Sequence, residues 1–354
     1  MAGSRKVRAE PDIDLVALRD ILRHRYGRGV TRLGFIPKGI DSWSYVAEVQ
    51  DGSRVFVKLC EPTRPDAQRR RGAELPLMTA LADLGFRLPR PIADRDGGLM
   101  SRFERFELVV LEYLEGQTME DETAWPEPLY AGVAGVMAAI HGSTESVRHL
   151  VPRTERYELP FLPPLVGTLD RLVAGAPFPA GDHPTLAGLR DLLAPRAAEL
   201  LEVVGGLEAL RDRARGRGGD TVLCHTDLWG SNLLLDDGGE LNVLDWDGAL
   251  IGPPEHDLFM FAGTGFFPAD RFGWFLDRYE AAFRPIPLDA DVFGFYFYRR
   301  NLEDLAEFVG LLTVGGIDDA DLRSGLGYAA DLVDEWPELE KRIAAVRQLL
   351  HDRA

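Results

Sequence analysis

The feature that most constrains this chain is a short polar loop, residues 225–232, that is enclosed by apolar segments. The loop holds His225, Asp227 and Asn232 in the spacing His-x-Asp-x-x-x-x-Asn, and Asp245 follows thirteen residues after Asn232. Short apolar runs typical of strands lie before and after this loop, at residues 221–224, 233–235 and 241–244. Since a turn-rich segment joins the last two runs, the sequence predicts a hairpin that returns Asp245 to the side of the loop.

These residue types suit the transfer of a phosphoryl group from a nucleotide triphosphate to a hydroxyl. The attacking hydroxyl must give its proton to a carboxylate, and Asp227 is the candidate base. Magnesium prefers hard oxygen ligands, which the Asn232 side-chain carbonyl and the Asp245 carboxylate can supply. His225 is expected to brace the loop through hydrogen bonds. The alternative, acids that only shape turns, does not explain the complete set between strands.

At these residues the chain resembles the aminoglycoside phosphotransferase and choline kinase superfamily, whose members are relatives of protein kinases. Trp229 stands where protein kinases usually have a lysine, which favours a kinase that acts on small molecules. Within the superfamily, the similarity to spectinomycin phosphotransferases is carried by residues 222–232, 244–247 and 254–258, with further matches at residues 39–42 and 300–304.

The resemblance implies an α+β, two-lobed protein-kinase-like fold. Residues 1–114 would form a small β-sheet lobe that binds the nucleotide, and residues 115–354 a large, mainly helical lobe for catalysis and substrate binding. It also implies Mg²⁺ as cofactor and ATP (or GTP) as co-substrate. The acceptor would be a hydroxyl of a cationic aminocyclitol or aminoglycoside antibiotic, similar to spectinomycin, and its modification would make the host resistant.

The N-terminal part of the chain carries the residue expected to steady the nucleotide phosphates. Two strands are predicted over residues 45–59, joined by Asp51 and Gly52, a dipeptide typical of a two-residue hairpin turn. Alternation along the second strand sends Phe56 and Lys58 to the same face. The resemblance implies that Lys58 contacts the α- and β-phosphates, whereas a solvated lysine at the end of a strand is the alternative.

Two further groups of residues are expected near those phosphates. Glu74 is the candidate partner of this lysine, on a helix predicted over residues 66–84 that Pro76 should kink or restart. Ser42 and Ser44, in the preceding loop, could touch phosphate oxygens through hydroxyl or backbone N–H groups. An ordinary hairpin turn would explain the two serines equally well.

A predicted strand that begins at residue 107 breaks into a loop near Gly116. The resemblance makes this loop the connection between the lobes, and the backbone around Glu112, Tyr113 and Leu114 is expected to hydrogen-bond the adenine. A core strand without this role is the alternative. Gly116 is a candidate hinge because glycine permits backbone angles that other residues resist.

Acidic residues in the C-terminal half are candidates for contact with a cationic substrate. Asp247 is expected to support the metal site, to contact a water on it or to face the substrate. Glu303 and Asp304 match a segment that helps to bind substrate in spectinomycin phosphotransferases, and an exposed helix face is the competing interpretation. Aromatic residues between positions 259 and 297 are expected mainly in a helical core. The proline-rich residues 152–184 predict an irregular surface segment.

The charge balance restricts the partners of the chain. The 40 Lys and Arg against 57 Asp and Glu give a formal net charge of −17, which disfavours nucleic acid and anionic membranes and suits a small cationic molecule. Cys60 and Cys224 lie in apolar runs and are expected to be free, buried thiols. No apolar run approaches the ~20 residues that span a bilayer. Together with the free thiols, this predicts a cytoplasmic protein. A monomer or a dimer is expected.

Three alternatives for the function stay open. One is a metabolic kinase of the same superfamily, acting on choline, homoserine, a thiosugar or a fructosamine. Another is a kinase for a different antibiotic, such as a macrolide or hygromycin. The third is a catalytically inactive kinase fold that binds a small molecule or a protein. The complete set of Lys58, Asp227, Asn232 and Asp245 argues against the third.

Overall fold

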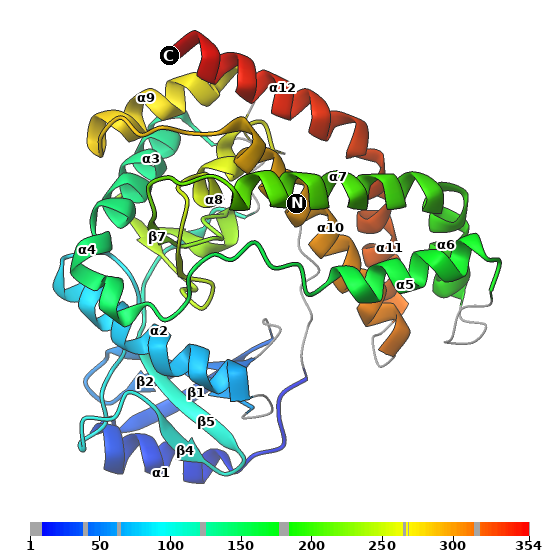
Figure 1. Ribbon diagram of the computed structural model, residues 1–354. Coiled ribbons are helices and arrows are strands. Elements are labelled where there is room, and N and C mark those ends of the chain that lie inside the picture. Colours follow the sequence, from blue (N-terminus) through cyan, green and yellow to red (C-terminus); the bar gives the residue numbers. More distant parts are fainter. Residues whose placement is uncertain are drawn as a thin grey trace. The chain divides into compact units, whose positions relative to one another are not determined.

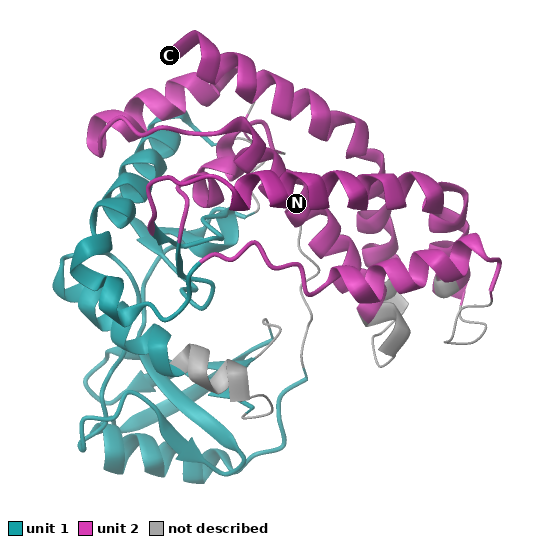
Figure 2. Ribbon diagram, in the orientation of Figure 1, with its two compact units in different colours: residues 1–154, 223–251 teal, residues 155–222, 252–354 magenta. Residues whose placement is uncertain are grey.

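The computed structural model divides into two compact units, each built from separate parts of the chain (Figure 2). Unit 1 comprises Met1–Thr154 and Leu223–Ile251, and unit 2 comprises Glu155–Val222 and Gly252–Ala354. The structure describes residues 9–37, 42–61, 65–120, 125–176, 184–264, 267, 269–314 and 319–353. Residues 39–41, which belong to the predicted phosphate-contacting loop, lie outside these ranges. Within them, no helix has the length and apolarity to span a membrane.

Unit 1 begins with an antiparallel sheet of strand order β1-β2-β3-β5-β4 (Figure 1). Its strands are β1 (Val30–Ile36), β2 (Ser42–Val49), β3 (Arg54–Cys60), β4 (Ser101–Phe103) and β5 (Phe106–Glu112). The turn predicted at Asp51 and Gly52 joins β2 to β3, and a φ of 85° at Gly52 explains why a glycine occupies it. In this register Lys58 lies opposite Ser44 on β2 and Val109 on β5.

Helix α1 (Leu15–Tyr26) packs on one face of this sheet. The Asp14 carboxylate caps the helix by accepting two backbone N–H groups of its first turn at 2.8 and 3.0 Å. Leu18 of the helix and Val57 of β3 are fully buried in a common core, and burial of each such side chain stabilises the fold by about 1.5–3 kcal/mol. Because neighbouring strand residues alternate between faces, Lys58 points to the face that α1 does not cover.

Unit 1 extends beyond the predicted lobe boundary at residue 114. Its other helices are α2 (Pro65–Asp83), α3 (Glu127–Gly142), α4 (Thr144–Val147) and η1 (Arg148–Leu150), and its other strands are β6 (Gln117–Thr118), β7 (Val222–Cys224), β8 (Leu233–Leu235), β9 (Leu241–Val243) and β10 (Leu250–Gly252). The predicted hairpin is β8-β9, β6 pairs with β8, and β7 pairs with β10. A Cβ atom on Gly116 would lie 2.4 Å from the carbonyl oxygen of Leu235. This glycine therefore permits the connecting segment to pack closely on β8.

Unit 2 is helical and is organised around the long helix α10, which contacts α5, α7, α11 and α12 (Figure 1). The helices are α5 (Leu162–Val173), α6 (Pro184–Leu193), α7 (Ala197–Arg215), α8 (Glu255–Leu258), α9 (Phe272–Ala282), α10 (Ala290–Val314), α11 (Asp319–Asp334) and α12 (Trp336–Arg353), with the short 3-10 turns η2 (Ala194–Arg196), η4 (Phe259–Phe261) and η5 (Ala269–Arg271). Aromatic side chains fill its core, among them Phe275, Tyr279, Phe293 and Phe295, as the sequence predicts.

The prediction of an irregular segment over residues 152–184 is wrong in part, because α5 lies within it. Pro163 and Pro164 occupy the first turn of this helix, where the N–H that proline lacks would not be used. Three leucines at helical spacing are buried on one face, namely Leu165, Leu169 and Leu172. The prolines therefore mark the start of a helix.

Candidate active site

The predicted catalytic loop joins β7 to β8 and ends in the 3-10 turn η3 (Gly230–Asn232). The side-chain amide of Asn232 donates to the Asp227 carboxylate at 2.9 Å and to the Asp227 main-chain carbonyl at 3.0 Å. Asn232 is buried, whereas Asp227 is partly exposed. Both bonds use the amide nitrogen, so they fix the orientation of the Asp227 carboxylate and leave the Asn232 side-chain oxygen as a ligand atom.

A close backbone contact holds this loop in place. A Cβ atom on Gly230 would lie 2.7 Å from the carbonyl oxygen of Met119, so a larger residue would push the loop away. The Met119 amide donates to the Gly230 carbonyl at 2.8 Å. The loop is therefore fixed to the segment that follows β6.

His225 links the catalytic loop to the hairpin, as predicted. Its Nε2 lies 2.9 Å from the carbonyl oxygen of Leu244, and its Nδ1 accepts the backbone N–H of Asp227 at 3.3 Å. The pair of bonds is satisfied when Nε2 carries the proton. The buried imidazole also contacts the Trp246 ring edge-to-face, with ring centroids 4.8 Å apart. His225 thus positions both loops at once.

The second loop carries two exposed carboxylates on either side of a buried tryptophan. Trp246 is buried and donates from its indole N–H to the Val243 carbonyl at 3.2 Å. Asp245 and Asp247 are exposed. Asp245 has a φ of 58° and Thr226 in the catalytic loop a φ of 76°, both in the left-handed region that residues other than glycine seldom adopt. Strain of this kind persists only where the surrounding structure enforces it.

Lys58 lies within reach of this second loop. Its Nζ is 3.8 Å from an Asp245 carboxylate oxygen, and its side chain is 30% exposed. Partial burial opposes the charge of Lys58, but the carboxylates of Asp245, Glu74 and Asp247 outweigh it and raise the pKa of the ammonium group. Lys58 is therefore a stable cation within a group of acids, which suits contact with phosphates.

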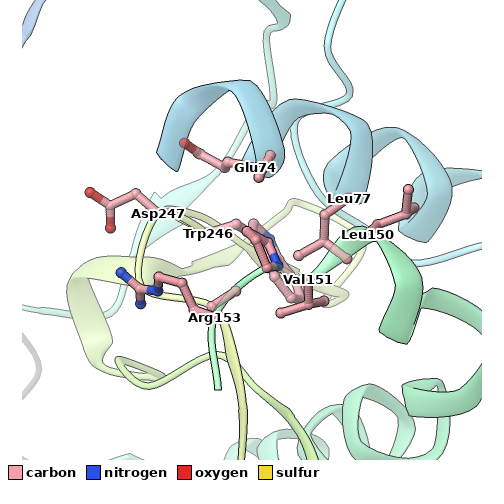
Figure 3. A pocket seen from close by; sticks show the side chains of 10 residues that line it. Glu74, Leu77, Leu150, Val151, Arg153, Trp246 and Asp247 are labelled. Atoms are coloured by element: carbon pink, nitrogen blue, oxygen red, sulfur yellow. The ribbon is translucent and has the colours of Figure 1, made fainter. Parts of the chain in front are cut away.

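Glu74 and Asp247 also line a small pocket of unit 1 (Figure 3). Helix α2 supplies Glu74, and Asp247 and Arg153 approach from the other side of the pocket. The remaining lining is mainly apolar and includes Leu77, Leu150, Val151 and Trp246. The structure thus brings the predicted partner of Lys58 close to the segment that carries Asp245.

The other residues predicted to bind the nucleotide, Ser42 and the segment from Glu112 to Leu114, lie at ends of strands in the same sheet. Ser42 begins β2, and Glu112 ends β5 opposite Val55. The Glu112 N–H donates to the carbonyl of Arg90 at 2.9 Å. The Arg54 guanidinium lies over the Tyr113 ring, 4.2 Å from its centroid. The backbone from Glu112 to Leu114 therefore continues directly from the end of β5, a strand that lies between β3 and β4 in the sheet.

The two acids predicted to contact substrate differ in their environments within α10. The Asp304 side chain is only 14% exposed, and its carboxylate accepts from Arg300 at 3.1 Å and from the Tyr328 hydroxyl at 2.7 Å. Glu303 is 43% exposed and pairs with Arg299 at 3.4 Å. Asp304 is thus held by two partners within unit 2, and Glu303 is the more accessible carboxylate.

A buried ionic cluster of unit 2 was not predicted. The Glu155 carboxylate accepts from Arg299 at 3.0 Å and from the Tyr296 hydroxyl at 3.2 Å, and His256 Nδ1 lies 3.4 Å from it. Burial alone would raise the pKa of Glu155, but His256 and Arg299 lower it below its ordinary value. These residues lie far apart in the sequence, so no spacing pattern could reveal the cluster.

Asn232 and Asp245, the predicted magnesium ligands, lie on neighbouring backbone segments. The Leu244 amide donates to the Asn232 main-chain carbonyl at 2.8 Å, so Asn232 and the residue after Leu244, Asp245, lie side by side where the hairpin closes. An amide oxygen and a carboxylate are the hard ligands that magnesium prefers, with water completing the shell. The predicted pair thus offers suitable donors in one place.

Comparisons with known proteins extend this interpretation. Residues 33–295 match the phosphotransferase enzyme family. Protein StrN of Streptomyces griseus is 25% identical over 301 residues, or 82% of each chain. Spectinomycin phosphotransferase in complex with ADP and spectinomycin superposes with a TM-score of 0.75 at 18% identity, over 93% of this chain and 99% of that one. For a macrolide 2'-phosphotransferase from Brachybacterium faecium, the TM-score is 0.56 at 22% identity, with 90% and 98% covered. The α+β, protein-kinase-like fold predicted from the sequence is thereby confirmed.

Proposed function

Because the chain belongs to the phosphotransferase enzyme family, we propose that it transfers the γ-phosphoryl group of ATP or GTP to a hydroxyl of a small cationic molecule. The observation that carries this proposal is the Asp227 carboxylate, which the Asn232 amide holds at 2.9 Å beside the hairpin that leads to Asp245. A carboxylate that is fixed and partly exposed can accept the proton of an attacking hydroxyl.

Four side chains divide the work in this proposal. Asp227 orients and deprotonates the acceptor hydroxyl, and Lys58 steadies the nucleotide phosphates. Asn232 and Asp245 hold magnesium, which when bound neutralises phosphate charge that would repel the nucleophile. The raised pKa of Lys58 supports its role, because the ammonium stays charged across the physiological pH range.

For the nucleotide, we propose residues 1–114 as the binding lobe, with Ser42 near the phosphates and Glu74 as the acid that helps to place Lys58. The Glu112 N–H is already bonded to the carbonyl of Arg90. Recognition of the base therefore falls to the next backbone groups, from the Glu112 carbonyl through Tyr113 to the Leu114 amide. The ADP in the spectinomycin phosphotransferase complex supports a nucleotide co-substrate.

The proposed acceptor is an aminocyclitol or aminoglycoside antibiotic similar to spectinomycin. The similarity to the spectinomycin-bound phosphotransferase supports this class, and the net charge of −17 favours encounter with a cation. Asp247 and Glu303 are the accessible candidates for its ammonium groups. Phosphorylation would add negative charge to a drug whose target is anionic RNA, so the modified drug would bind weakly and the host would be resistant.

The test is magnesium-dependent consumption of ATP and of GTP with a panel of acceptors. The panel contains spectinomycin, other aminocyclitols, aminoglycosides, a macrolide, choline and homoserine, and Asp227→Ala serves as the blank for contaminating activity. Turnover with an aminocyclitol or aminoglycoside that the blank lacks is the expected result. Turnover with choline or homoserine alone would assign a metabolic kinase instead. Nucleotide binding without turnover of any acceptor would contradict the proposed acceptor class.

A further inference from the structure

A segment outside the predicted catalytic residues lies against the loop that carries Asp245. The backbone N–H of Ile251 donates to the carbonyl of Arg153 at 2.9 Å, and Thr154 forms a parallel bridge with Ile251. The side chain of Arg153 turns back and donates from its guanidinium to the carbonyl of Gly248. Arg153 is thus attached to both ends of the short run from Gly248 to Ile251.

Gly248 in turn lies against the catalytic loop. A Cβ atom on Gly248 would be 2.4 Å from the Thr226 hydroxyl oxygen and 3.3 Å from the His225 carbonyl. Only a residue without a side chain permits this approach. The loop of Asp245 therefore contacts the loop of Asp227 through Gly248, and Arg153 holds the carbonyl of that same glycine.

The two connected loops contain the strained backbone positions of the site. Thr226 and Asp245 have φ values of 76° and 58°, and such conformations are costly and persist only where neighbouring contacts enforce them. A hydrogen bond from a charged donor is stronger than a neutral one. A guanidinium bond to the Gly248 carbonyl is therefore suited to keeping the strained loop in place.

The electrostatic setting points the same way. Arg153 lines the pocket that Glu74 and Asp247 also line (Figure 3). Glu74, Asp245 and Asp247 all act on Lys58, so like charges gather around the proposed magnesium ligand. Arg153 thus places a cation at the same pocket of unit 1 as two of these acids.

We propose that Arg153 is a positioning residue for the phosphoryl-transfer site. Through Gly248, its guanidinium fixes the loop of Asp245 against the catalytic loop, so that Asp245 keeps the geometry needed for magnesium while Asp227 keeps its orientation. In this proposal Arg153 acts through the Gly248 carbonyl. The effect on catalysis rests on the proposed function, whereas the effect on the loop does not.

The test compares Arg153→Ala and Arg153→Lys with Arg148→Ala, which removes another arginine of unit 1, one that pairs with Glu145. ATP binding is measured by titration calorimetry, once in EDTA and once in magnesium. Arg153→Ala should keep metal-free ATP binding but lose about 10- to 100-fold of the gain in affinity that magnesium gives, the usual effect of removing a residue that orients a metal ligand. Arg153→Lys, which retains a charged donor, should recover part of the gain, and Arg148→Ala should leave it unchanged.

Loss of ATP binding in EDTA as well would indicate a general structural defect and contradict the proposal, as would an unchanged magnesium effect in Arg153→Ala. Amide hydrogen exchange supplies a readout that needs no ligand. Exchange at residues 245–251 should be faster in Arg153→Ala than in the other proteins, at an equal melting temperature. If the wild type bound no nucleotide, the proposed function would fail, and this exchange comparison would still decide whether Arg153 holds the loop.

Discussion

Asp245 of unit 1 and Glu155 of unit 2 are two carboxylates in opposite environments. In unit 1, the Asp245 side chain is 50% exposed, and its loop has a left-handed backbone that no glycine relieves. In unit 2, the Glu155 side chain is 6% exposed and is matched by Arg299, His256 and the Tyr296 hydroxyl. Glu155 is therefore a buried acid with partners in unit 2, whereas Asp245 is an exposed acid of unit 1 in a loop with a left-handed backbone.

This difference indicates which acids are structural and which serve a ligand. A buried charge without a partner is strongly destabilising, so Glu155 needs its cations to be present in the fold. An exposed acid has no such need, yet Asp245 has a left-handed backbone, which carries a conformational cost. Strained positions of this type concentrate at functional sites, which supports a ligand as the reason for the geometry of Asp245.

Replacing acids of unit 1 should give the largest effect on activity. Asp227→Ala removes the proposed base and Asp245→Ala a proposed magnesium ligand, so each should lower turnover about 10³-fold or more, as for loss of a general base. Neither side chain supports the core, so the melting temperature should stay within a few degrees. Steady-state phosphorylation assays and thermal melts check both statements. Substantial residual activity in both variants would refute the mechanism. It would also mean that the exposed acids of unit 1 do not differ in function from the paired acids of unit 2.

Replacing Glu155 should have the opposite outcome. Glu155→Ala leaves Arg299 without its buried partner, and breaking such a pair costs about 3–5 kcal/mol. Because the pKa of Glu155 is lowered in the fold, its charged form contributes stability above its ordinary pKa of 4.5, and this contribution is lost as the pH falls below that value. Urea denaturation at pH 7 and pH 4 measures the loss, which should be larger at pH 7.

The matched control is Glu145→Ala, since Glu145 forms only an exposed pair with Arg148 on the surface of unit 1. Such pairs contribute about 0–1 kcal/mol. Two outcomes would contradict this prediction: an equal loss in the free energy of unfolding for both variants, or a loss in Glu155→Ala that does not depend on pH. Either would show that the buried cluster does not stabilise unit 2 through the charge of Glu155.

The sequence was sufficient for three strands of the sheet, β2, β3 and β5, and for the β8-β9 hairpin, because these depend on local signals, whereas β1 and β4 were not predicted. Alternation placed Lys58 on the face opposite to the α1 core, and short apolar runs located β7, β8 and β9. The roles of the site residues stay predictions. The sequence also does not identify the acceptor molecule, because accessible carboxylates alone do not distinguish one small cation from another.

What the sequence did not predict depends on contacts between distant segments. The Glu155 cluster joins residues from positions 155, 256, 296 and 299, and no periodicity relates them. The left-handed backbone of Thr226 and Asp245 occurs in two loops that meet at Gly248, a contact that no local pattern reveals. The wrong prediction at α5 had another cause. A proline-rich stretch of sequence can be the start of a helix as well as a loop, and composition does not distinguish the two.

A second acid of unit 2, Glu255, extends the comparison of buried acids because it is held mainly in its protonated form. It is 4% exposed, and its carboxyl accepts the backbone N–H of Asp289 at 2.8 Å. Burial raises the pKa of Glu255 to about 8, so the group is mainly protonated in the fold at neutral pH. Unit 2 therefore uses two solutions for a buried acid, namely pairing at Glu155 and protonation at Glu255.

Glu255→Gln should give the smallest and most specific effect. The folded state keeps a proton on Glu255 up to about pH 8, whereas the unfolded carboxyl loses it near pH 4.5. The stability that Glu255 contributes is thus complete below pH 4.5 and declines as the pH rises toward 8. Glutamine retains the acceptor oxygen for Asp289 without a charge, so the variant should match the wild type near pH 4.5 and melt a few degrees higher at pH 8. Thermal melts across this range test the sign, and a difference that does not grow with pH would mean that Glu255 is ionised in the fold and belongs with the paired acids.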